Sequence, residues 1–183
     1  MQKSMPVHFS AAPWPKSLKL ISTLGTILIL ALGISAYLAI PIPSGFTHLF
    51  GLGIALVLPS ILGLSLLFMV TGYAVEGSDL YVKRLFFSTR IALGGLSRVS
   101  FEPGICKGSI RLWGNGGLYS FTGLYRSKGL GNYRLFGTDL SRSVVLFRPR
   151  HVVVITPAAP HAFIDYMQHL FPTVHAEPGD RRS

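Results

Sequence analysis

Hydrophobic and polar positions divide the chain into three parts. No Asp, Glu, Lys or Arg occurs between Lys19 and Glu76, and this uncharged block holds two long apolar runs, 20–40 and 49–70. At ~1.5 Å per residue in a helix, each run reaches about 30 Å, which is the thickness of the hydrocarbon core of a bilayer. The pattern predicts a transmembrane hairpin over residues 20–71, preceded by a basic cytoplasmic tail, 1–19.

The residues between the two runs predict how the hairpin lies in the membrane. Residues 41–45 contain two prolines and a glycine, which end the first helix and turn the chain. So short a connection permits only an antiparallel pair. The turn has no Lys or Arg, whereas Lys16 and Lys19 precede the first helix and Lys83 and Arg84 follow the second. Because positive charge gathers on cytoplasmic segments, we expect both termini to be cytoplasmic.

A cleavable signal peptide is the alternative interpretation of residues 1–40. Its apolar region would span ~7–15 residues and end at a small-x-small site, but here the run is longer and no Ala-x-Ala site follows it. Trp14 and Tyr73 flank the two helices and are expected as interfacial anchors. Small residues that would let the helices pack closely recur at every fourth position: Ala31, Ser35 and Ala39, then Gly51, Ala55, Pro59 and Gly63.

After residue 71 the pattern changes to short aliphatic and β-branched runs separated by turns. It predicts about seven strands, in 73–75, 80–84, 90–93, 98–101, 132–136, 143–147 and 151–156. A final helix is expected from Pro160, which suits a first turn. Its predicted core-facing stripe, at helical spacing and ended by Pro172, is Phe163, Met167, Leu170 and Phe171. Residues 172–183 have the composition of a disordered tail.

Several segments of residues 72–171 resemble the bacterial pleckstrin-homology-like domains of uncharacterised membrane proteins. They are GYAVEGSDLYV (72–82), RLWGNGGLY (111–119), GLYR (123–126), LGNY (130–133) and ITP (155–157), which leads into Phe163. The resemblance implies an α+β protein: a two-helix transmembrane hairpin followed by a PH-like β-sandwich or barrel of about seven strands with a C-terminal helix. It also implies a bacterial cytoplasmic (inner) membrane. It implies no common ligand or reaction.

The segment from Arg111 to Asn132 is rich in glycine and aromatic residues. A phosphate-binding loop is one interpretation, but the segment contains no GxGxxG and no GxxxxGK[ST], and no predicted helix begins at its glycines. The alternative is an irregular excursion between strands, in which glycine permits positive φ angles or a close approach of backbones. The sequence favours the second interpretation.

The formal charge is +10, and 14 of the 17 Lys and Arg residues lie after residue 75. Basic residues near an anionic leaflet each contribute about 1 kcal/mol of attraction. A domain that follows a membrane helix directly must have one face near the headgroups. The candidate interaction surface therefore combines basic residues with aromatic and polar neighbours: Lys83, Arg84, Arg90, Arg111, Trp113, Asn115, Arg126, Lys128 and Arg134.

The sequence is compatible with three classes of function. The favoured one is a non-catalytic interaction or scaffold module that binds a protein partner or itself, and the alternative is an anionic lipid-headgroup sensor. An enzyme with a non-contiguous site is third, because no HExxH, GxSxG or paired-cysteine pattern is present. We expect no catalytic residues, no metal and no cofactor. Nucleic acid is not expected as a partner, since no known binding module is recognisable.

Overall fold

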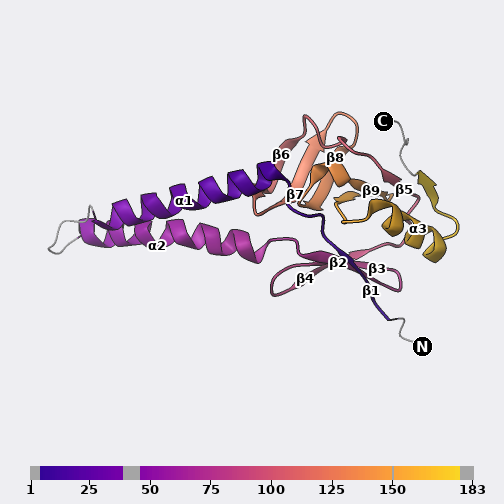
Figure 1. The fold of residues 1–183 in the computed structure, drawn as a ribbon, viewed down its shortest axis with the longest axis horizontal. Coiled ribbons are helices and arrows are strands. Elements are labelled where there is room, and N and C mark those ends of the chain that lie inside the picture. The colour runs from indigo at the N-terminus through magenta and orange to yellow at the C-terminus, as the bar shows by residue number, and fades with distance from the viewer. Residues whose placement is uncertain (1–4, 39–45, 150, 178–183) are drawn as a thin grey trace.

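The computed structural model describes residues 5–38, 46–149 and 151–177. It is an α+β protein in which two helices project from a β-rich domain (Figure 1). Helix α1 (Lys16–Leu38) runs away from the domain, and α2 (Phe46–Leu67) returns beside it. The predicted turn at 41–45 lies outside the described residues. Pro59 lies inside α2 without ending it.

Helix α1 is the one described helix that is long and apolar enough to cross a membrane. The apolar stretch of α2 that meets the same composition test, Gly51–Leu67, is shorter. The helices meet at small residues, although not all of the expected ones. A Cβ on Gly33 would lie 3.7 Å from Pro59 and 3.9 Å from the carbonyl oxygen of Ala55, so α2 uses two of its predicted positions, whereas a Cβ on Gly63 would meet no atom within 4 Å. On α1, Ala31 and Ser35 are exposed and Gly33 takes their place.

The β-domain contains two sheets. The first is antiparallel, in the order β1 (Val7–Ser10), β2 (Gly72–Glu76), β3 (Asp79–Lys83) and β4 (Ser88–Ala92). The second has the order β11-β5-β9-β10-β8-β7-β6, and β10 runs parallel to β8. Its strands are β5 (Arg98–Phe101), β6 (Ile110–Leu118), β7 (Ser120–Ser127), β8 (Gly131–Gly137), β9 (Val144–Phe147), β10 (Val152–Ile155) and β11 (His175–Glu177).

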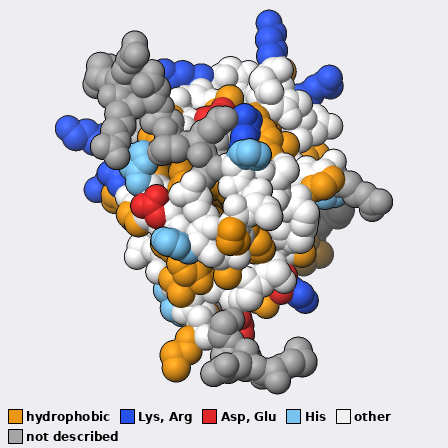
Figure 2. Space-filling model, turned by 90° about the vertical axis from the view of Figure 1, so that its right-hand side faces the viewer, with side chains coloured by type: hydrophobic (Ala, Val, Ile, Leu, Met, Phe, Trp, Pro, Cys, Tyr) orange, Lys and Arg blue, Asp and Glu red, His pale blue; other side chains and the backbone are white. Residues whose placement is uncertain are grey.

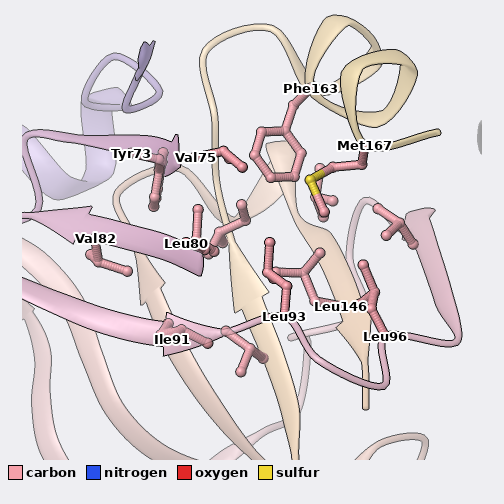
Figure 3. Close-up of a cluster of buried hydrophobic side chains, with 14 of the residues drawn as sticks. Tyr73, Val75, Leu80, Val82, Ile91, Leu93, Leu96, Leu146, Phe163 and Met167 are labelled. Atoms are coloured by element: carbon pink, nitrogen blue, oxygen red, sulfur yellow. The ribbon is translucent and has the colours of Figure 1, made fainter. Parts of the chain in front are cut away.

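The main core lies where the first sheet, β5, β9, β10 and α3 (Pro160–Leu170) meet. Phe163 and Met167 point from α3 into the same cluster as Leu80, Leu93 and Leu146 (Figure 3), and all five side chains are fully buried. Each buried apolar side chain of this size contributes about 1.5–3 kcal/mol. The predicted stripe is confirmed at Phe163 and Met167, and Pro160 occupies the first turn. Phe171 packs against this core while only partly buried, and Leu170 was wrongly included because it is 36% exposed.

Tyr73 belongs to this core and is not an interfacial anchor. Its ring is 1% exposed, and its hydroxyl donates a hydrogen bond to the carbonyl oxygen of Phe136 at 2.7 Å and accepts one from the backbone N–H of Thr156 at 3.1 Å. Burial raises the pKa of Tyr73 to about 12. The phenol therefore links the first sheet to the second.

Both terminal segments contribute strands, β1 and β11. The prediction of a disordered tail was therefore wrong at residues 175–177, whereas the cytoplasmic position of residues 1–19 stays a prediction. Residues 7–10 of the basic tail pair with β2, with Val7 opposite Val75, and the Phe9 ring lies 5.0 Å from that of Phe163. At the other end, β11 pairs in parallel with β5, and Val174 is buried. A few apolar residues in each tail complete a sheet edge that the rest of the chain leaves open, which local composition does not reveal.

The seven predicted strands are present as β2, β3, β4, β5, β8, β9 and β10. Four further strands appear in the described residues, namely β1, β6, β7 and β11. The glycine-rich segment is therefore built on paired strands, with register shifts between Arg111 and Trp113 and between Gly116 and Leu118, and is not an excursion between strands. Two of its glycines permit a close backbone approach: a Cβ on Gly114 would lie within 2.2 Å of the Thr122 carbonyl oxygen, and one on Gly123 within 2.0 Å of that of Trp113.

Candidate functional site: a basic groove between α2 and the β6–β8 face

A groove of about 800 Å³ separates the last turns of α2 from one face of strands β6, β7 and β8. We call it the junction groove. Its helix wall consists of Ile61, Leu64, Ser65 and, just beyond the helix, Phe68. Its strand wall is formed by Arg111, Trp113, Gly114, Asn115, Leu118, Thr122, Gly123, Arg134 and Phe136, and Arg84 completes the lining. The groove thus has an apolar side and a side with three arginines.

The β6–β7 hairpin reaches this position because its tip is fixed to the base of α1. Tyr119 adopts a φ of 66°, and its hydroxyl shares a hydrogen bond of 2.7 Å with Thr26 Oγ1. The Tyr119 backbone N–H donates to Ser22 Oγ at 2.9 Å, and Ser22 is buried. The Trp14 ring lies 6.1 Å from that of Tyr119. These contacts hold the hairpin and α1 together.

Arg84 occupies the inner end of the groove and is only 8% exposed. Its guanidinium donates to the carbonyl oxygen of Phe68, and its Nε to Thr89 Oγ1 at 3.2 Å. The rings of Phe68, Phe87 and Phe136 lie 5.2–5.5 Å from it, close enough for cation–π attraction. Burial, and then the charge of Arg134, lower the pKa of Arg84.

Arg134 supplies exposed positive charge to the groove, whereas the guanidinium of Arg111 lies against Gly116. Arg134 projects from β8, and its guanidinium lies 5.3 Å from the Phe136 ring. Arg111 lies near a register shift in β6 and also lines a second cavity, on the other face of the sheet. Among the described residues, no carboxylate forms an ion pair with Arg84, Arg111 or Arg134.

The other candidate residues fall into two groups. Trp113 lines the junction groove and is 80% exposed, whereas Asn115 mainly closes the hairpin through hydrogen bonds with the backbone of Leu118. The remaining residues do not line the groove. Arg90 pairs with Asp79 at 2.8 Å, Lys83 ends β3, and Arg126 and Lys128 are exposed at the far end of the β7–β8 hairpin.

Sequence inspection missed the helix side of this groove. Ile61, Leu64 and Phe68 were interpreted as part of a uniform apolar span. No local signal distinguishes them, because their role depends on the strands that lie opposite. Their position near the end of the second apolar run, next to the basic domain, was the one clue available.

The second cavity, of about 380 Å³, lies against Cys106, Tyr125 and Tyr133. Tyr133 donates to Ser109 Oγ at 2.7 Å, and burial raises the pKa of the Cys106 thiol. A raised pKa disfavours the thiolate that a nucleophilic cysteine needs. Within the described residues, no group of three or more His, Cys, Asp or Glu side chains is placed to hold a metal.

The face opposite the helices has a different character. Figure 2 shows hydrophobic side chains, histidines and charges of both signs scattered over it, without one dominant patch of a single kind. His161, on α3, lies beside Phe101, with the two ring centroids 5.1 Å apart. The junction groove, in contrast, brings three arginines next to apolar side chains of α2.

Comparison with known protein families identifies the family of the β-rich domain. The family model described as the bacterial PH domain matches residues 71–170, which is nearly the range over which the sequence resembles such domains and more than half of the chain. No curated protein and no solved structure matches. With a β-rich domain closed by α3 over the matched residues, the chain belongs to the bacterial PH domain family.

Proposed function

We propose that this protein is a membrane-anchored, non-catalytic binding module of the bacterial inner membrane. In this proposal α1 and α2 cross the bilayer as an antiparallel hairpin and both termini are cytoplasmic. The observation that carries it is the outer surface of α1, where Leu24, Ile27, Leu28 and Ile34 each expose more than half of their area. Apolar surface in water costs ~25 cal/mol per Å², so a helix of this kind is stable when lipid covers it.

The domain surface next to the helices supports the same placement. The turn between β3 and β4 presents Leu85, Phe86 and Phe87, of which Phe86 is 77% exposed. This turn lies at the level of the end of α2, because the Phe87 ring is 5.6 Å from that of Phe68. Exposed aromatic residues at this level suit the interface between headgroups and hydrocarbon.

Fractionation and labelling test the anchoring. The full chain should stay in the membrane pellet after alkaline carbonate washing, and recovery in the supernatant would refute the proposal. In a Cys106→Ser background, Ser78→Cys in the exposed β2–β3 turn should react with a membrane-impermeant maleimide only after the cells are opened. Ser44→Cys, in the predicted turn, should react in intact cells. The opposite pattern would invert the orientation.

The edge strand β6 is the surface that best fits a protein partner. It is the last strand of its sheet, and Ile110 and Leu112 on it are 68% and 48% exposed. An edge strand offers unpaired backbone N–H and C=O groups, to which an extended segment of another chain can add. A partner strand, from another protein or from a second copy, would cover this apolar edge.

Photocrosslinking in native membranes tests this edge. A photoreactive amino acid at Ile110 should give one discrete adduct, while the same group at Leu170, a partly exposed position on α3, serves as the matched control. Adducts of equal yield at both positions, or none at Ile110, would remove β6 as the partner surface. Mass spectrometry of the adduct separates self-association from a different partner.

A second candidate function, binding of anionic lipid headgroups, is favoured by the junction groove. Its arginines lie where a membrane-anchored domain would meet the cytoplasmic leaflet. The two functions use adjoining surfaces of β6, its outer edge and the face that lines the groove.

A further inference from the structure

We propose that the junction groove holds one anionic glycerophospholipid from the adjacent leaflet, its phosphate between Arg84 and Arg134 and its chains along Ile61 and Leu64. This inference rests on the proposed membrane crossing of α2. It deepens the second candidate function by naming a site, a ligand class and the residues that select it.

The charged residues of the groove favour an anionic ligand. The guanidinium groups of Arg84 and Arg134 lie 5.5 and 5.3 Å from the centroid of the same ring, that of Phe136. Burial, and then the charge of Arg134, lower the pKa of Arg84, and no Asp or Glu is among the residues that line the groove. Two guanidinium groups without a carboxylate repel each other. A phosphate between them would remove that repulsion and accept charge-assisted hydrogen bonds, for which guanidinium geometry is well suited.

The α2 wall of the groove favours an apolar part of the ligand. Leu64 and Ile61 precede the end of α2 at Leu67 by three and six residues, so they lie ~4.5 and ~9 Å further along the helix axis. Both are substantially exposed, at 55% and 43%. With α2 in the bilayer, these side chains would be at the depth where acyl chains begin, while the arginines on the domain side would be at the depth of the phosphates.

The aromatic residues of the groove agree with an occupant that is polar at one end and apolar at the other. Trp113 has an apolar ring and a polar N–H, the combination that suits a membrane interface. Phe68 and Phe136 hold the arginines by their ring faces. A groove of about 800 Å³ is within the usual range of ligand sites, ~300–1,000 Å³. It would take the headgroup and the first chain carbons, and the bilayer would hold the remainder.

A phospholipid fits better than a peptide or a free anion. A soluble anion would satisfy the arginines and leave Ile61 and Leu64 uncovered. An acidic peptide would have to enter between the domain and the bilayer surface. A lipid already present in the leaflet would contact both the arginines and the apolar helix wall. It would not have to enter between the domain and the bilayer.

The experiment uses the full chain in nanodiscs of phosphatidylglycerol and phosphatidylcholine, followed by transfer to a non-ionic detergent and native mass spectrometry. We expect wild-type protein to retain one phosphatidylglycerol in preference to phosphatidylcholine. Arg134→Gln should weaken this retention about fivefold, as expected for one basic residue at an anionic surface. Arg134 is exposed, so the variant should fold. Arg126→Gln, an equal loss of charge outside the groove, is the matched control and should retain lipid normally.

Three outcomes would overturn the inference: no retained lipid on wild-type protein, equal retention of both lipids, or equal losses in the two arginine variants. The last would mean attraction by overall charge alone. Displacement of the retained lipid by inorganic phosphate at millimolar concentration would also overturn it, by identifying a site for a free anion. Failure of the anchoring is distinguishable, because it would appear in carbonate washing before any lipid is counted.

Discussion

The two halves of the larger sheet are built on different principles. In one half, β5, β9 and β10 are covered by α3 and the first sheet, and their inward side chains are fully buried aliphatic residues. In the other half, β6, β7 and β8 carry glycines, aromatic residues and arginines, and one face borders a groove instead of a core. The covered half supplies stability, and the open half supplies the surface on which we place binding.

The largest effect should come from Phe163→Ala in the covered half. Phe163 is fully buried and its ring packs edge-on against Phe9, so the change would leave a cavity and lower the free energy of unfolding by about 3–5 kcal/mol. Denaturant unfolding of the full chain in detergent measures this. Leu170→Ala on the same helix is the control, because Leu170 is 36% exposed. Equal losses in the two variants would contradict the division.

A smaller effect is expected from Gly123→Ala in the open half. Its methyl group would collide with the Trp113 carbonyl oxygen across the hairpin, and relief of the clash should cost about 1–3 kcal/mol. Gly131→Ala is the matched control, because Gly131 has φ 65° but no atom within 4 Å of the added carbon. If Gly131→Ala were the more harmful change, backbone conformation and not close approach would be the reason for the glycines.

The smallest effect should come from the link between the open half and α1. Removing the hydrogen bond between Tyr119 and Thr26 by Tyr119→Phe should cost about 0.5–1.5 kcal/mol. A double-mutant cycle with Thr26→Val should give a coupling of that size. Tyr37→Phe, an exposed tyrosine on α1, should have no measurable effect. A coupling of zero would mean that the hairpin tip is not fixed to the helix.

The sequence predicted the covered half well because each of its elements carries its own periodicity. The β-branched and aliphatic run from Val144 to Leu146 indicates a strand by residue type alone. Phe163 and Met167, four residues apart, indicate one face of a helix. The same method failed for β6 and β7. Gly114 and Gly123 are unfavourable in isolated strands, and they are accommodated here because each allows the partner strand to approach closely.

Some of the candidate residues come together in the structure and some do not. Arg84, Arg111, Trp113, Asn115 and Arg134 line one groove, whereas Lys83, Arg90, Arg126 and Lys128 do not line it. That this groove binds a ligand stays a prediction. Charge and residue type identify basic residues near a membrane helix. They do not reveal which of these residues an ion pair has already neutralised, as Asp79 does for Arg90.

The amino-acid sequence by itself determined the segments: the uncharged block, seven of the strands, the last helix and the family to which the domain belongs. These follow from local hydrophobic periodicity and from residues that are close together in the chain. Only the tertiary structure decided that residues 7–10 and 175–177 form strands, that Tyr73 is buried, and that Arg84, Arg111 and Arg134 line a groove at the end of α2. Such features depend on contacts between residues far apart in sequence, and the free energy of those contacts is absent from any local pattern.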